Sequence, residues 1–121
     1  QATHNLRTLV QRLLAQQGIK SNIALNGNAK LSDAEAIAQA QDAISEKGEF
    51  GVEAVSERLF KAAVAMSGGD TAKLEEMKAA IQKGFKQAEK AFGGGLPEIC
   101  HKTLDATMTK LDNWAKGEAQ A

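Results

Sequence analysis

The side chains with the most reactive chemistry in this sequence are Cys100 and His101, which are adjacent near the start of a predicted helix. A thiol in the first turn of a helix is favoured as its thiolate, and a histidine is a candidate base for it. Neighbours on a helix point about 100° apart, however, so His101 is poorly placed to accept the Cys100 proton. A buried, unreactive thiol is the alternative that we favour, because cysteine is among the most buried residue types. The sequence therefore predicts no catalytic residue.

Metal and phosphate sites require patterns that this chain lacks. A zinc site needs about four Cys, His or carboxylate ligands, and the sequence has one cysteine and two histidines at unrelated spacings. Gly93-Gly94-Gly95 precedes a predicted helix, where phosphate can bind, but no strand comes before it and no lysine follows it as in a phosphate loop. We expect these glycines to end a helix, and we expect neither a metal nor another cofactor.

Carboxylates are plentiful, and Glu53 and Glu57 lie four residues apart on one predicted helix face. Such a pair can perform acid–base chemistry, but a solvated face with local ion pairs is the more common arrangement. Arg58 follows them, beside the inward-facing Leu59. One hypothesis is that Arg58 is buried and paired with a carboxylate such as Asp105 or Asp112.

Composition places the chain among soluble globular proteins, with 43% apolar and 25% charged residues in 121 positions, and predicts a single domain over 1–121. The 15 basic residues equal the 15 acidic ones, so we expect no nucleic acid as the main ligand. No apolar run approaches the roughly 20 residues of a membrane span. One cysteine permits a reducing compartment but does not establish one, so the location stays open, with the cytoplasm favoured over the alternatives. The chain begins at Gln1, so whether a leader or a further domain precedes it stays open.

Apolar residues at three- and four-residue spacing predict five helices. Gly18 is expected to end the first helix, and Ser32 with Glu35 forms a capping box at the start of the second. The predicted helices span 3–17, 32–46, 52–66, 71–92 and 97–117, with a loop at 19–31 and a frayed tail at 118–121.

The turn from Gly93 to Pro97 predicts that the last two helices form an antiparallel hairpin. We therefore expect an all-α fold, a single-domain antiparallel helical bundle of about five helices with a longer loop after the first. Gly84 lies in the middle of the fourth helix, where glycine costs about 1 kcal/mol relative to alanine. A neighbouring backbone or ring that approaches closely is the expected compensation.

Several segments between Ile44 and Trp114 resemble an uncharacterised bacterial all-helical domain family. They are Glu46-Lys47-Gly48-Glu49-Phe50-Gly51-Val52, Ser56-Glu57-Arg58-Leu59, Gly84-Phe85-Lys86-Gln87-Ala88-Glu89, Gly94-Gly95-Leu96-Pro97-Glu98-Ile99 and Lys102-Thr103-Leu104. The resemblance implies a helical domain of bacterial origin, sometimes in proteins from flagellated species, which suggests a motility-associated role. It implies no established activity, and Cys100 stands where the relatives carry other small residues.

Two functions remain open from the sequence. The first is a non-enzymatic helical interaction module that binds a protein partner or itself through the first helix, with an interaction face formed by Leu6, Leu9, Leu13 and Leu14. The alternative is a small-ligand-binding protein or weak enzyme with a pocket between the third, fourth and fifth helices, lined by Glu57, Arg58, Gly84, His101 and Thr103. The sequence does not identify a partner, a pathway or an oligomeric state.

Overall fold

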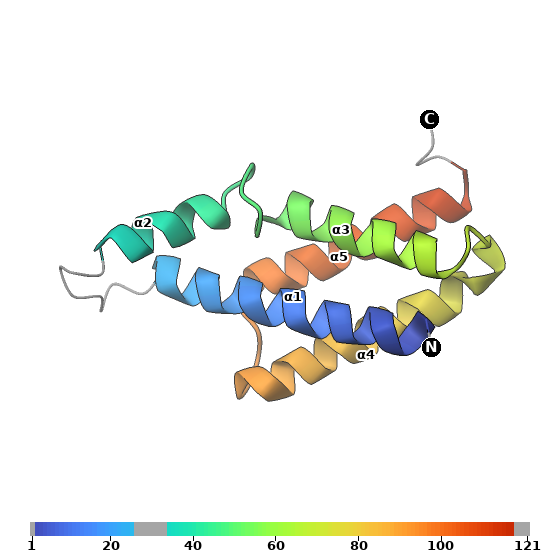
Figure 1. The fold of residues 1–121 in the computed structure, drawn as a ribbon, viewed down its shortest axis with the longest axis horizontal. Coiled ribbons are helices and arrows are strands. Elements are labelled where there is room, and N and C mark those ends of the chain that lie inside the picture. The colour runs from blue at the N-terminus through green and yellow to red at the C-terminus, as the bar shows by residue number, and fades with distance from the viewer. Residues whose placement is uncertain (1, 26–33, 118–121) are drawn as a thin grey trace.

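The computed structural model describes residues 2–25 and 34–117, and over these residues it contains helices and no strand (Figure 1). The all-α bundle is thus confirmed, and so is the predicted helix over 52–66. The helix predicted over 71–92 begins as a short 3-10 turn and continues as an α-helix. The elements are α1 (Ala2–Leu25), α2 (Ala34–Ala43), α3 (Val52–Met66), η2 (Thr71–Lys73), α4 (Leu74–Phe92) and α5 (Glu98–Ala115).

The four long helices pack as two pairs, α1 on α4 and α3 on α5 (Figure 1). Within the first pair the helices run in the same direction, because Arg7 faces Gly84 near the start of α1 and Gly18 faces Phe92 further along. Between the pairs they run in opposite directions, since Lys78 near the start of α4 contacts Asp112 near the end of α5. The turn at 93–95 therefore reverses the chain as predicted, although each arm packs mainly on another helix.

Gly84 is the point where α1 and α4 come closest. A Cβ atom placed on Gly84 would lie 2.6 Å from the carbonyl oxygen of Arg7 and 2.8 Å from the Cβ of Val10. These distances are too short for a side chain, so only glycine permits this approach. The prediction that a neighbouring backbone compensates for a glycine in mid-helix is confirmed.

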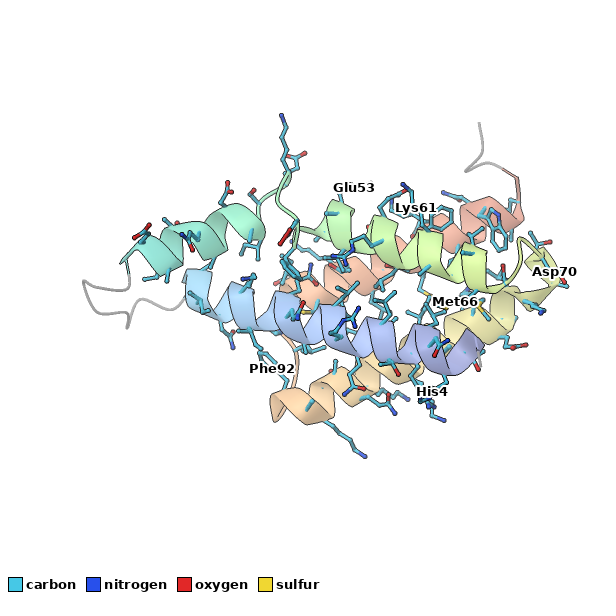
Figure 2. All side chains as sticks on the ribbon, viewed as in Figure 1. His4, Glu53, Lys61, Met66, Asp70 and Phe92 are labelled. Atoms are coloured by element: carbon cyan, nitrogen blue, oxygen red, sulfur yellow. The ribbon has the colours of Figure 1, made fainter. Side chains whose placement is uncertain are left out.

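The prediction that Gly18 ends the first helix is wrong, because α1 continues to Leu25. Gly18 is helical and buried, and a Cβ there would lie 2.9 Å from the ring of Phe92 and 3.2 Å from Pro97. Figure 2 shows Phe92 at the end of α4, on the side that faces α1. Tertiary packing thus outweighs the low helix propensity of glycine, and residues 19–25 are helix instead of loop. Residues 26–31 of that loop, Ser32 of the capping box and the tail 118–121 lie outside the described residues.

The helix α2 lies beside the last turns of α1, and together they extend past the end of the four-helix core (Figure 1). Ala40 is buried, and the side-chain amide of Gln41 donates to the carbonyl of Ala24 at 3.2 Å. The predicted end at Glu46 is wrong, since α2 ends at Ala43 and a series of turns leads to Val52. Phe50, in these turns, points inward and is 7% exposed.

The hydrophobic core lies between the two helix pairs. Its largest fully buried apolar side chains come from each of the four long helices, namely Leu6, Leu13, Leu14, Leu59, Met77, Ile81 and Leu111.

Candidate functional site

A cleft lies where the beginnings of α3 and α5 meet the turns after α2 and the side of α1. It encloses about 590 Å³ and is open to solvent on one side. We call it the α3–α5 cleft, and its lining consists of Ser21, Ile44, Glu46, Val52, Glu53, Glu98, Ile99 and Lys102. Figure 2 marks Glu53 in the first turn of α3, on the rim of this cleft.

The floor of the α3–α5 cleft is aliphatic, because Ile44, Val52 and Ile99 converge there. Two glycines make this possible, since a Cβ on Gly48 would collide with the backbone carbonyls of Asp42 and Ala43, and one on Gly51 with that of Ser45. The turns between α2 and α3 are therefore tight enough to bring Ile44 close to Val52. All three floor residues stay partly exposed, so the cleft presents apolar surface to solvent.

Charged side chains surround this floor, and several of them are paired. Lys110 of α5 donates to Glu53 at 2.9 Å and to Glu57 at 3.1 Å. Partial burial lowers the pKa of Lys110, but the hydrogen bonds to both carboxylates outweigh this effect and raise it. Lys102 lies 3.4 Å from Glu98, one turn away on α5. The lining of the cleft thus contains three carboxylates and one lysine, and once Lys110, the partner of Glu53, is counted, the excess of negative charge is one.

The residues predicted to line a pocket between the third, fourth and fifth helices do not converge. Gly84 faces α1, Arg58 is exposed, and Glu57 forms ion pairs with Lys110 and with Lys61 at the surface. Thr103 is fully buried, and its hydroxyl donates to the carbonyl of Ile99 on its own helix at 2.9 Å.

The remaining member of that set is His101, which is exposed and packs edge-on against the ring of Phe85 with the ring centroids 5.0 Å apart. The hypothesis of a buried Arg58 paired with Asp112 is wrong, because Asp112 pairs with Lys78 at 2.8 Å. Asp105, the other carboxylate considered for Arg58, is itself exposed.

The four leucines predicted as an interaction face belong to the interior of the bundle. Leu6, Leu13 and Leu14 are at most 2% exposed, and Leu9 packs partly buried against the same core. The apolar stripe of α1 is covered by α4 and by the other helices of its own chain. A partner can reach these leucines only if α1 leaves the bundle.

Cys100 is fully buried, and its thiol donates to the carbonyl of Leu14 at 3.3 Å. Burial raises the pKa of Cys100 to about 12, so the thiol is neutral at physiological pH. Its partner is a backbone oxygen instead of a base, and His101 is exposed on another side of α5. This geometry agrees with the expected packed thiol.

Two features of the structure were missed by sequence reasoning. Gln17 is fully buried, and its amide donates to the carbonyl of Phe50 at 2.9 Å, which ties α1 to the turns before α3. The zero net charge also conceals a separation of charge, since α1 and α4 together carry seven basic and three acidic residues. The described chain over α2, residues 44–51, α3 and α5 carries five basic and nine acidic ones. The absence of any Asp or Glu between residues 2 and 25 was the available signal.

Known proteins give no independent assignment of this site. No protein-family model matches the chain, and neither the curated proteins nor the solved structures contain a match. The described helices include none that is long and apolar enough to cross a membrane. Within residues 2–25 and 34–117, no three His, Cys, Asp or Glu side chains are grouped to hold a metal ion. The resemblance to a bacterial helical family stays a prediction.

Proposed function

We propose that this chain is a non-enzymatic protein-interaction module that binds a short segment of a partner protein in the α3–α5 cleft. The observation that carries the proposal is the aliphatic floor of Ile44, Val52 and Ile99 inside a rim of charged residues. An apolar centre with a polar edge is the usual composition of a protein-docking surface. The one nucleophilic thiol of the chain is buried and neutral, which argues against covalent catalysis.

Charge indicates the chemistry of the partner. Three carboxylates and one lysine line the cleft, and the surrounding helices α2, α3 and α5 belong to the acidic part of the molecule. A segment that presents one or two aliphatic or aromatic side chains, flanked by Lys or Arg, would match both the floor and the rim. Acidic segments would be repelled.

The experiment is selection of a phage-displayed random peptide library on the folded chain, followed by mapping of the best peptide by NMR. We expect the selected peptides to combine apolar and basic residues and to shift the amide signals of Ile44, Val52 and Ile99. The double variant Glu46→Lys/Glu98→Lys should weaken binding by roughly tenfold or more, because two favourable charge contacts become repulsive. Glu75→Lys/Glu76→Lys, the same charge reversal at two exposed glutamates of α4 outside the cleft, is the matched control and should bind normally.

Two outcomes would contradict the proposal. If the selected peptides share no apolar and basic pattern, or if the amide shifts map to another surface, the cleft is not the docking site. Equal binding by the Glu46→Lys/Glu98→Lys variant would show that the acidic rim does not select the partner.

A small apolar ligand is the second candidate, since about 590 Å³ falls within the usual range of small-molecule sites. The openness of the cleft and its few convergent polar groups make it the weaker candidate. Titration with a fragment library, observed on the same amide signals, separates the two. Saturable shifts with fragments and none with peptides would favour the small ligand.

A further inference from the structure

A second surface groove lies between the last turns of α1 and the turns before α3. It encloses about 350 Å³ and shares no residue with the α3–α5 cleft. We call it the isoleucine groove, and its lining consists of Gln16, Ile19, Lys20, Ile23, Glu49 and Phe50.

The isoleucine groove holds the exposed large hydrophobic side chains of the described residues. Ile19 is 51% exposed and Ile23 is 39% exposed, and they are one helical turn apart on the same face of α1. Single exposed apolar residues are ordinary, but two neighbours beside a concave surface form an apolar patch. Phe50, almost fully buried, closes the bottom of the groove. The surface therefore contains both projecting side chains and a hollow that can receive them.

Its charges are balanced, which distinguishes it from the α3–α5 cleft. Lys20 is the cation of the lining and Glu49 is the anion. The Lys20 ammonium lies 5.6 Å from the centre of the Phe50 ring, so it covers one side of the groove. A strongly charged partner would therefore gain little electrostatic binding energy from this groove. Because the lining carries one charge of each sign, a twofold contact can pair each lysine with the glutamate of the other copy.

We propose that the chain forms a twofold symmetric dimer through the isoleucine groove. Ile19 and Ile23 of each copy occupy the hollow of the other, and Lys20 of each copy faces Glu49 of its partner. A closed twofold contact uses the same patch twice, so it needs a surface that can complement itself, and this one offers exposed apolar side chains beside a hollow and one charge of each sign. The groove shares no lining residue with the α3–α5 cleft, so two clefts on one dimer could bind a repetitive partner with higher avidity.

Sedimentation velocity over a range of concentrations tests the proposal. The unmodified chain should convert from monomer to dimer as concentration rises, and Ile19→Glu should weaken the dimer by at least tenfold because a carboxylate would enter the apolar contact. Thr8→Glu, exposed on the same helix but outside the groove, is the control and should dimerise normally. Circular dichroism confirms that each variant keeps its helices.

A charge exchange gives the sharper test. Lys20→Glu puts two glutamates opposite each other at both symmetric contacts, and Glu49→Lys does the same with lysines. Each variant alone should dimerise roughly tenfold less well or worse, because symmetry counts each repulsion twice. An equimolar mixture should recover dimers, since every contact then joins a lysine to a glutamate. Variants that had simply lost their fold would not regain dimers on mixing.

A chain that stays monomeric up to its solubility limit would overturn the proposal. So would an undiminished dimer of the Ile19→Glu variant, or a mixture of the two charge variants that remains monomeric. Peptide binding to the Ile19→Glu monomer is measured separately and should be unchanged. Failure of the dimer is thereby distinguished from failure of the proposed peptide-binding function.

Discussion

Replacement of Gly84 by alanine should destabilise the bundle, although alanine is the better helix former. Helix propensity alone favours the substitution by about 1 kcal/mol. The new Cβ, however, would lie 2.6 Å from the Arg7 carbonyl oxygen and 2.8 Å from the Cβ of Val10. Both are anchored on α1, so α1 must move away along its contact with α4. Overpacking of a well-packed core costs about 1–3 kcal/mol, so we expect a net loss of about 0–2 kcal/mol.

Urea denaturation followed by circular dichroism and by the fluorescence of Trp114 measures this loss. Trp114 is the only tryptophan and is buried, so its emission reports on tertiary structure. Gly95→Ala is the matched control, because nothing lies within 4 Å of a Cβ at Gly95. Gly84→Val should cost considerably more than Gly84→Ala, since its larger side chain meets the same backbone. A stabilisation of about 1 kcal/mol in Gly84→Ala would refute the close approach of α1 and α4.

Four further predictions concern three buried or paired groups. Because burial raises the pKa of Cys100 from 9.0 to about 12, its thiolate fraction at pH 8 should be roughly a thousandfold lower than in the unfolded chain, and iodoacetamide should react correspondingly slowly. The unfolded chain loses the Cys100 proton at a lower pH than the folded chain does. The free energy of unfolding should therefore fall above pH 9 by up to about 1.4 kcal/mol per pH unit. Urea titrations of Cys100→Ala should lack this contribution. Gln17→Ala leaves the Phe50 carbonyl without its donor and should cost about 1–3 kcal/mol in urea denaturation. Asp112→Asn should cost about 0.2–1 kcal/mol at low ionic strength and less in about 1 M salt, because its pair with Lys78 is partly exposed.

The helices were predictable wherever the apolar spacing and the positions of the glycines indicated the same helix ends. Residues 52–66 follow Gly51 and end just before Ser67-Gly68-Gly69, and their apolar stripe packs as expected. Gly18 shows where this reasoning ends, because a glycine that ends a helix and one that admits a neighbouring ring look the same in sequence. The Phe92 ring that decides between them is 74 positions away in the chain. Periodicity alone does not contain that contact.

The candidate site was less predictable than the fold, for a related reason. Ile44, Val52 and Ile99 carry the same inward-facing pattern as true core residues, and only the packing of four segments leaves them partly open. The leucines of α1 show the converse, since a strong apolar stripe suggested a free face that α4 in fact covers. Spacing identifies which side chains are apolar on one face, whereas topology decides whether the chain itself covers that face.

The separation of charge gives the two proposed surfaces different responses to salt. The α3–α5 cleft belongs to the acidic part of the molecule, so association with a basic segment should weaken as salt screens the attraction. The isoleucine groove carries one charge of each sign, and its attraction depends mainly on apolar contact. The Lys20–Glu49 pairs of the proposed dimer would set the orientation of the two copies more than their affinity. Added salt should therefore release a bound peptide while leaving most of the dimer intact. If one surface bound both the peptide and the second copy, salt would affect the two associations alike.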